Sequence, residues 1–226
     1  MSLFAAYCGR KEAHIVTDTF AFRGDDSFVG ILPKAVPLVP RNIVIAGRGN
    51  FETVETVIDQ FRLTSETTDE IGDRLVQTTQ AVFEEYYREN LKPAADFSSV
   101  NVNDLEAAYI QIVAIGWSER HKSFVGYAVW NNREGEWAFE TRHKQFFGAP
   151  VPTEDKLPVL HHDNPRLPGD LIKLAKAQYL TISGVAEDRG YETELCGGEL
   201  IHYRITNDAV KYSTIYEFPN RGRFKR

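Results

Sequence analysis

The stretch MSLFAAYCGRKEAHIVTD, residues 1–18, decides the fold, because it places two apolar runs on either side of a short polar turn. The first run begins at Leu3 and the second covers residues 13–18. Two such runs joined by a tight polar connection predict a β-hairpin. The first few residues of most domains are loose, but here the predicted core begins directly after Ser2. The sequence therefore raises the question of whether Ser2 carries chemistry.

The bulk composition of the 226 residues is that of an ordinary globular protein. Hydrophobic residues make up 42% and charged residues 26%, which argues against disorder. No apolar run approaches the roughly 20 residues that span a bilayer, and the start lacks the pattern of a secretory signal. Two cysteines, Cys8 and Cys196, are too few for a disulfide scaffold and fit a reducing cytoplasm. The net charge of −6 argues against general binding of nucleic acid, and we interpret the basic tail RGRFKR as a solvated end.

The hydrophobic period beyond the hairpin alternates between that of strands and that of helices. A helical period predicts one helix after an N-cap at Asn50, a second over residues 68–90 and a third over 169–188. Strands are predicted over residues 34–40, 42–49, 108–117, 123–131, 136–142, 197–207 and 211–219.

Two stretches, residues 19–33 and the proline-rich 148–170, are predicted to be irregular. The order of the remaining elements is strands, two helices, strands, helix, strands. This order favours an α+β fold, a four-layer αββα sandwich of two antiparallel sheets, in one domain over residues 1–226.

Three polar residues along the chain are evenly spaced. Asp18 follows Ser2 by sixteen residues and stands in the context I-V-T-D, and Lys34 follows Asp18 by another sixteen. A glycine-rich AGRG occupies residues 46–49, and CGGELIHYRI occupies 196–205. Together these features resemble the proteasome β-type subunits and their bacterial relatives, which are N-terminal nucleophile (Ntn) hydrolases. The resemblance is carried by the first part and the last part of the chain.

The resemblance implies that Met1 is removed and that the hydroxyl of Ser2, where the family usually has threonine, is the nucleophile. A freed α-amino group has an ordinary pKa of about 7.7–8.0 and is a usable base near neutral pH. The ammonium of Lys34 would favour the alkoxide-like state of the nucleophile, and Asp18 would hold Lys34 charged and oriented. Whether the amine or the lysine takes the proton stays open. The reaction implied is hydrolysis of a peptide bond through an acyl-enzyme ester, without a cofactor or metal.

The glycines at the end of the fourth predicted strand, where it turns into a helix, are candidates for an oxyanion hole, since backbone N–H groups near a helix N-terminus can stabilise a developing negative charge. We favour Gly49, with Gly47 second, and expect Arg48 to reach the substrate pocket and favour an acidic side chain. Two supporting positions depart from the family, whose aspartate and serine are Thr193 and Cys196 here. These departures leave the activity of the site open.

Two alternatives come from other functional classes. A catalytically silent structural subunit would keep the assembly and lose the chemistry, and an Ntn amidase would cleave a small amide but not a peptide. Because relatives assemble into rings or helical stacks, the resemblance implies a homo-oligomer, and any ATPase unfoldase would be a separate chain.

Other candidate residues are weaker. The adjacent His161, His162 and Asp163 are of metal-binding types, but three neighbours in a loop rarely all face one ion, so we expect no metal there. His14 and Cys8 stand within predicted strands and are expected to be structural. The chain contains neither a G-x-S-x-G elbow nor a P-loop motif.

Overall fold

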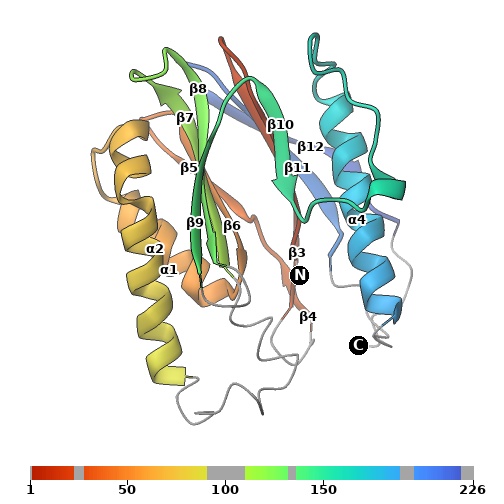
Figure 1. Ribbon diagram of the computed structural model, residues 1–226, viewed down its shortest axis with the longest axis horizontal. Coiled ribbons are helices and arrows are strands. Elements are labelled where there is room, and N and C mark those ends of the chain that lie inside the picture. The colour runs from red at the N-terminus through yellow and green to blue at the C-terminus, as the bar shows by residue number, and fades with distance from the viewer. Residues whose placement is uncertain (1, 23–27, 91–109, 132–135, 189–195, 220–226) are drawn as a thin grey trace.

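A computed structural model of the chain describes residues 2–22, 28–90, 110–131, 136–188 and 196–219. Two five-stranded antiparallel sheets lie face to face, and helices cover the outer face of each sheet (Figure 1). This is the predicted αββα order, and the predicted fold class is confirmed.

The first sheet joins the two ends of the chain. Its order is β10 (Gln145–Ala149), β1 (Phe4–Cys8), β2 (Ala13–Asp18), β11 (Glu199–Ile205), β12 (Val210–Glu217). The predicted hairpin of β1 and β2 is present, with Phe4 opposite Thr17. On its other edge, β2 pairs with β11, and Leu200 lies opposite Asp18. The segment that follows Cys196 therefore lies next to the end of β2.

The second sheet has the order β5 (Ala35–Leu38), β6 (Ile43–Gly49), β7 (Ile110–Ser118), β8 (Ser123–Asn131), β9 (Trp137–Arg142). Side chains alternate along β6, as in any strand. Val44 and Ala46 join the core between the two sheets, whereas Ile43 and Ile45 pack toward the helices. The edge strand β5 begins one residue after Lys34.

The helices begin where the sequence predicts. In α1 (Phe51–Arg62), the N-cap Asn50 accepts a hydrogen bond from the Thr53 N–H at 3.1 Å. A capping box precedes α2 (Thr68–Asn90), because the Glu70 carboxylate accepts from the Thr67 N–H and the Thr67 hydroxyl accepts from the Glu70 N–H. Helices α1 and α2 cover the second sheet, and α4 (Gly169–Asp188) covers the first.

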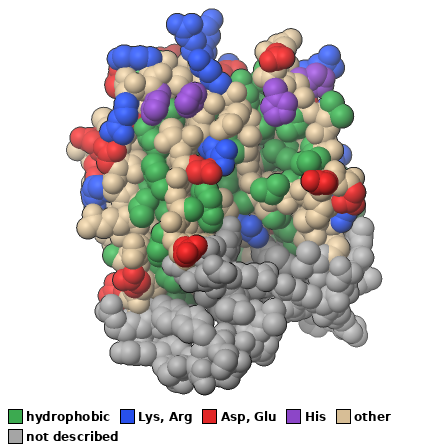
Figure 2. Space-filling view, viewed as in Figure 1, with side chains coloured by type: hydrophobic (Ala, Val, Ile, Leu, Met, Phe, Trp, Pro, Cys, Tyr) green, Lys and Arg blue, Asp and Glu red, His purple; other side chains and the backbone are tan. Residues whose placement is uncertain are grey.

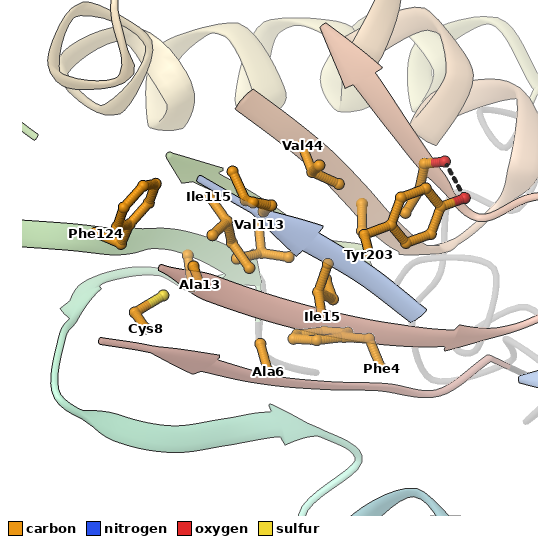
Figure 3. Close-up of a cluster of buried hydrophobic side chains, with 14 of the residues drawn as sticks. Phe4, Ala6, Cys8, Ala13, Ile15, Val44, Val113, Ile115, Phe124 and Tyr203 are labelled. Carbon is orange, nitrogen blue, oxygen red and sulfur yellow. Dashed lines mark hydrogen bonds between the residues drawn. The ribbon is translucent and has the colours of Figure 1, made fainter. Parts of the chain in front are cut away.

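Apolar side chains fill the space between the sheets (Figure 3). This core includes Phe4, Ile15, Val113, Phe124 and Tyr203. Cys8 belongs to it, as predicted, and burial raises the pKa of its thiol. Two further cores lie between each sheet and its helices. The central strands of each sheet are thus buried on both faces, which is why β2, β6, β7 and β8 are largely continuous apolar runs.

Two parts of the prediction of irregular structure are wrong. Strands β3 (Phe20–Phe22) and β4 (Phe28–Ile31) form a two-stranded ribbon within residues 19–33. Their apolar runs are very short, and the glycine and aspartates between them are typical of a loop, so the sequence did not predict the pairing. Strand β10 extends into the predicted loop 148–170, because β1 gives it a partner: Phe4 lies opposite Ala149. The same loop contains a short 3₁₀ helix, η1 (Glu154–Lys156).

The two ends of the sheets differ in character. At one end the turns after β1, β7 and β9 meet, since the Phe124 N–H donates to the Gly9 carbonyl and the Lys144 N–H to the Cys8 carbonyl. Basic side chains and histidines gather over this end, at the top of Figure 2. Asp18, the last residue of β2, and Lys34, directly before β5, both lie at the other end of the sandwich. In the part of the chain that the structure describes, no helix is both long and apolar enough to cross a membrane.

Candidate active site

Asp18, the last residue of β2, lies against the start of the chain. Its Oδ1 atom accepts a hydrogen bond from the Leu3 N–H at 3.0 Å, and its own N–H donates to the Leu3 carbonyl at 3.5 Å. The side chain of Asp18 is 0% exposed. The hairpin therefore places Leu3, the residue after Ser2, in hydrogen-bond contact with a buried carboxylate.

Lys34 reaches the same carboxylate from the second sheet. Its Nζ atom lies 2.8 Å from Asp18 Oδ1, and its side chain is 9% exposed. Because the Leu3 N–H and the Lys34 ammonium bind one oxygen, they lie within two hydrogen-bond lengths of each other. The sequence prediction that Asp18 pairs with Lys34 agrees with this contact. A buried ion pair is a poor source of net stability, so its presence here is a reason to expect a site.

The loop before β11 completes the hydrogen bonding of Asp18. The Gly197 N–H donates to Asp18 Oδ2 at 3.0 Å, and the Gly197 carbonyl accepts from the N–H groups of Thr19 and Phe20, each at 3.2 Å. Gly198 has a φ of +74°, and a Cβ there would lie 2.6 Å from the Phe20 ring. Only glycine fits this close approach of two chain segments.

Cys196 begins this loop and is buried in the core beneath α4. It directly precedes Gly197, whose N–H donates to the Asp18 carboxylate. The second supporting position, Thr193, lies outside the described residues, as does Met1. The role of Gly197 as a hydrogen-bond donor to Asp18 was missed by the sequence analysis, although the paired glycines had marked the loop.

Ser2 directly precedes Leu3 and is half-buried. In β1, Phe4, Ala6 and Cys8 face the core between the sheets. Continuing this alternation backward puts the Ser2 side chain on the same side, toward the space between the sheets. The three residues predicted from spacing are therefore brought together at one end of the sandwich.

The two candidate glycines differ sharply. The Gly47 N–H already donates to the Lys34 carbonyl at 3.3 Å, and a Cβ at Gly47 would meet the side chains of Val54 and Ile112. Gly47 is thus explained by packing and strand pairing. Backbone N–H groups of a strand point alternately to its two edges, so the Gly49 N–H points to the same edge as that of Gly47. Strand β5 begins opposite Ala46, so Gly49 extends beyond it.

Gly49 is exposed and has a φ of +126°. Arg48 is half-buried and, by the alternation of β6, lies on the face of Val44 and Ala46, which is the face toward the other sheet. Both residues are therefore at the end of the sandwich that holds Ser2.

The remaining candidates lie elsewhere. His161 Nδ1 lies 3.0 Å from Asp170 in the first turn of α4, where hydrogen bonds hold the pKa of Asp170 below its ordinary value despite its burial. His14 lies in β2 with its Nδ1 atom 2.8 Å from Nε2 of His202. Within the described ranges, no group of three or more His, Cys, Asp or Glu side chains could hold a metal ion.

Comparison of the chain with solved structures assigns its fold. It has the sandwich fold of proteasome-like Ntn proteins. The similar structures include Anbu from Hyphomicrobium sp. strain MC1, with 13% identity, a TM-score of 0.56, and 98% of this chain and 90% of that chain covered. Anbu from Yersinia bercovieri, described as an ancestral beta-subunit, has 10% identity, a TM-score of 0.56 and coverage of 95% and 88%. Neither protein-family models nor curated protein sequences match the chain.

Proposed function

We propose that the chain is an Ntn hydrolase of the proteasome-like type, which cleaves peptide (amide) bonds with Ser2 after removal of Met1. The observation that carries this proposal is the buried pair of Asp18 and Lys34, bonded to the N–H of the residue that follows Ser2. A buried ion pair adds little net stability to a fold, whereas a serine nucleophile needs a neighbouring group that takes its proton or favours its ionised form.

In the proposed reaction, the Ser2 hydroxyl attacks the carbonyl carbon of the scissile amide as its proton passes to a base. That base is the freed α-amino group or Lys34. The tetrahedral intermediate then collapses, the C–N bond breaks, and the departing amine takes the proton. Water hydrolyses the resulting ester and regenerates Ser2. Where the α-amino group is the base, Asp18 holds the Lys34 ammonium in place, and that ammonium stabilises the negative charge that develops on the serine oxygen.

Gly49 is the proposed oxyanion donor. Its N–H points beyond the start of β5, whereas the Gly47 N–H is engaged with the Lys34 carbonyl. Arg48 is proposed to face the substrate side chain next to the scissile bond and to favour an acidic one. A guanidinium suits this task because it binds a carboxylate through two parallel hydrogen bonds.

The proposed setting is the cytoplasm, with the chain in a homo-oligomeric ring or stack and any ATPase unfoldase as a separate protein. The similarity in fold to the Yersinia bercovieri protein, an ancestral beta-subunit, supports an assembly of this kind.

The test is the intact mass of the protein, produced with an untagged N-terminus, before and after a β-lactone electrophile. We expect loss of Met1 and one adduct that is absent in Ser2→Ala. Ser213→Ala, an exposed serine of β12, is the matched control and should keep the adduct. A retained Met1, or a processed chain without an adduct, would contradict the hydrolase proposal.

One observation favours the alternative of a silent structural subunit: the buried Cys196 stands where the resemblance implies a serine. That subunit would assemble, lose Met1 or not, and form no adduct. A small-molecule amidase would form the adduct but cleave only small amides, so a peptide library and a panel of acyl amides separate these two.

A further inference from the structure

A tyrosine from the first sheet reaches the second sheet beside Lys34. The Tyr203 hydroxyl, on β11, donates a hydrogen bond of 3.0 Å to the carbonyl of Ala35, the first residue of β5 (Figure 3, dashed line). Tyr203 is 3% exposed and Ala35 is 2% exposed, so the bond lies inside the core between the sheets.

The strand geometry explains why the Ala35 carbonyl needs this partner. Successive carbonyls of a strand point to opposite edges. The Lys34 carbonyl points toward β6, where it accepts from the Gly47 N–H. The Ala35 carbonyl therefore points away from β6, and β5 is the edge strand of its sheet. A buried carbonyl without a donor costs about 1–3 kcal/mol, and Tyr203 supplies the donor.

The segment around Lys34 is held at three points. The Leu32 N–H donates to the Thr19 carbonyl at 2.8 Å, Gly47 binds the Lys34 carbonyl, and Tyr203 binds the carbonyl that follows. A lysine side chain has four rotatable bonds of its own, so a backbone fixed on both sides of Lys34 limits the positions that its ammonium can occupy. The hydrogen bond from Tyr203 fixes the backbone on the C-terminal side of Lys34.

We infer that Tyr203 is a positioning residue for the reaction: it anchors the start of β5 from the opposite sheet and so holds the Lys34 ammonium on Asp18 beside Ser2. The inference rests on the proposed hydrolase function. Tyr203 is suited to the task because burial raises the pKa of its phenol to about 12, and the hydroxyl stays a donor at every working pH.

The test compares Tyr203→Phe with Tyr127→Phe. The buried Tyr127 also donates a hydrogen bond from its hydroxyl, of 2.6 Å to the partly buried Asp69, but on the helix side of the second sheet. We expect the rate of Ser2 acylation by a β-lactone to fall about 10- to 100-fold in Tyr203→Phe, because small misplacements of catalytic groups have effects of that size. Tyr127→Phe should react like the wild type.

The pH dependence of acylation separates positioning from general loosening. A fixed ammonium lowers the proton affinity of the neighbouring α-amino group. Releasing Lys34 should therefore move the rise of the rate to higher pH in Tyr203→Phe alone. An unchanged rate and profile, or a Tyr203→Phe chain that does not fold while Tyr127→Phe does, would overturn the inference.

A readout that needs no activity keeps the two proposals distinct. In ¹⁵N-lysine spectra, a Lys34 ammonium signal, assigned with Lys34→Met, should be present in the wild type and in Tyr127→Phe and be lost in Tyr203→Phe. The Gly47 amide should exchange faster with solvent in Tyr203→Phe. If the wild type forms no adduct, the hydrolase proposal fails, yet these signals still decide whether Tyr203 holds Lys34: identical signals in all three chains overturn it.

Discussion

The two ends of β2 each bury a titratable residue, and they treat its charge in opposite ways. The Asp18 carboxylate is paired, with an ammonium and two backbone N–H groups bound to its two oxygens. His14 lies next to His202 with the two rings only 9° from parallel, and burial lowers the pKa of both. One strand thus holds a carboxylate paired with an ammonium at one end. At its other end it holds a histidine whose lowered pKa favours the neutral form.

This difference indicates that the pair of Asp18 and Lys34 marks a site, whereas the pair of His14 and His202 is a structural contact. The histidine pair joins β2 to β11 through the hydrogen bond between its rings, and His14 Nε2 lies 3.1 Å from the partly exposed carboxylate of Glu12. The pair of Asp18 and Lys34 requires desolvation of two charges, and a well-packed apolar pair of similar volume would be at least as stable. The fold therefore carries at one end an arrangement that stability alone does not explain.

Asp18→Asn should have the largest effect. The substitution removes the negative charge and leaves the buried Lys34 ammonium without a counter-ion, so we expect a loss of about 3–5 kcal/mol in the free energy of unfolding. Urea unfolding followed by circular dichroism measures it. Lys34→Met in the same chain should recover part of the loss, because both charges are then absent. A loss below about 1 kcal/mol in Asp18→Asn would mean that the charges are solvated.

Gly198→Ala should come next. The new Cβ would lie 2.6 Å from the Phe20 ring and 2.7 Å from Thr19 Oγ1, at a φ of +74°. Overpacking and backbone strain of this kind cost about 1–3 kcal/mol each, so we expect a loss of about 2–3 kcal/mol by urea unfolding. Gly169→Ala, where a Cβ meets nothing within 4 Å, is the control and should be close to neutral. Equal stability of the two variants would contradict the close approach at Gly198.

The elements that the sequence predicted correctly carry local signals. The helices over residues 68–90 and 169–188 were predicted to the residue, because apolar spacing and charged first turns mark their limits. The ribbon of β3 and β4 and the edge strand β10 were missed, since their formation depends on partners rather than on their own composition.

The candidate site was predictable only in part. The spacing of Ser2, Asp18 and Lys34 located them through a resemblance, and their catalytic roles stay predictions. The hydrogen bonds from Gly197 to Asp18 and from Tyr203 to Ala35 join residues more than 150 positions apart in the chain. No local pattern encodes such contacts, because they follow from β11 lying beside β2 and from the way the two sheets face each other.

The histidine end of β2 should make stability depend on pH. The pKa of His202 falls from 6.5 to about 4 in the folded protein, chiefly through burial, and that of His14 is also lowered. The unfolded chain therefore binds more protons between pH 6.5 and 4, and stability falls as the pH falls through this window. Since His202 is only partly buried, we expect its share to be about 1–2 kcal/mol rather than the full value of the shift.

Urea unfolding of the wild type and of His202→Gln at pH 7, 6, 5 and 4 isolates this contribution from that of the carboxylates. The variant should lose less stability over the range. Parallel curves for the two proteins would mean that His202 is protonated in the folded state, and the contrast with Asp18 would then disappear.

Glu12→Gln should have the smallest effect and makes the comparison direct, because it changes a carboxylate to an amide at the histidine end of β2, as Asp18→Asn does at the other. Although burial alone would raise the pKa of Glu12, hydrogen bonds from Arg204 and His14 hold it below its ordinary value. Both Glu12 and Arg204 are partly exposed, so water can replace the lost contact, and we expect a loss of only about 0.5 kcal/mol at pH 7. Urea unfolding in low and high salt measures it. A loss as large as that in Asp18→Asn would mean that both ends of the strand depend on buried charge, and the ion pair of Asp18 and Lys34 would no longer mark a site.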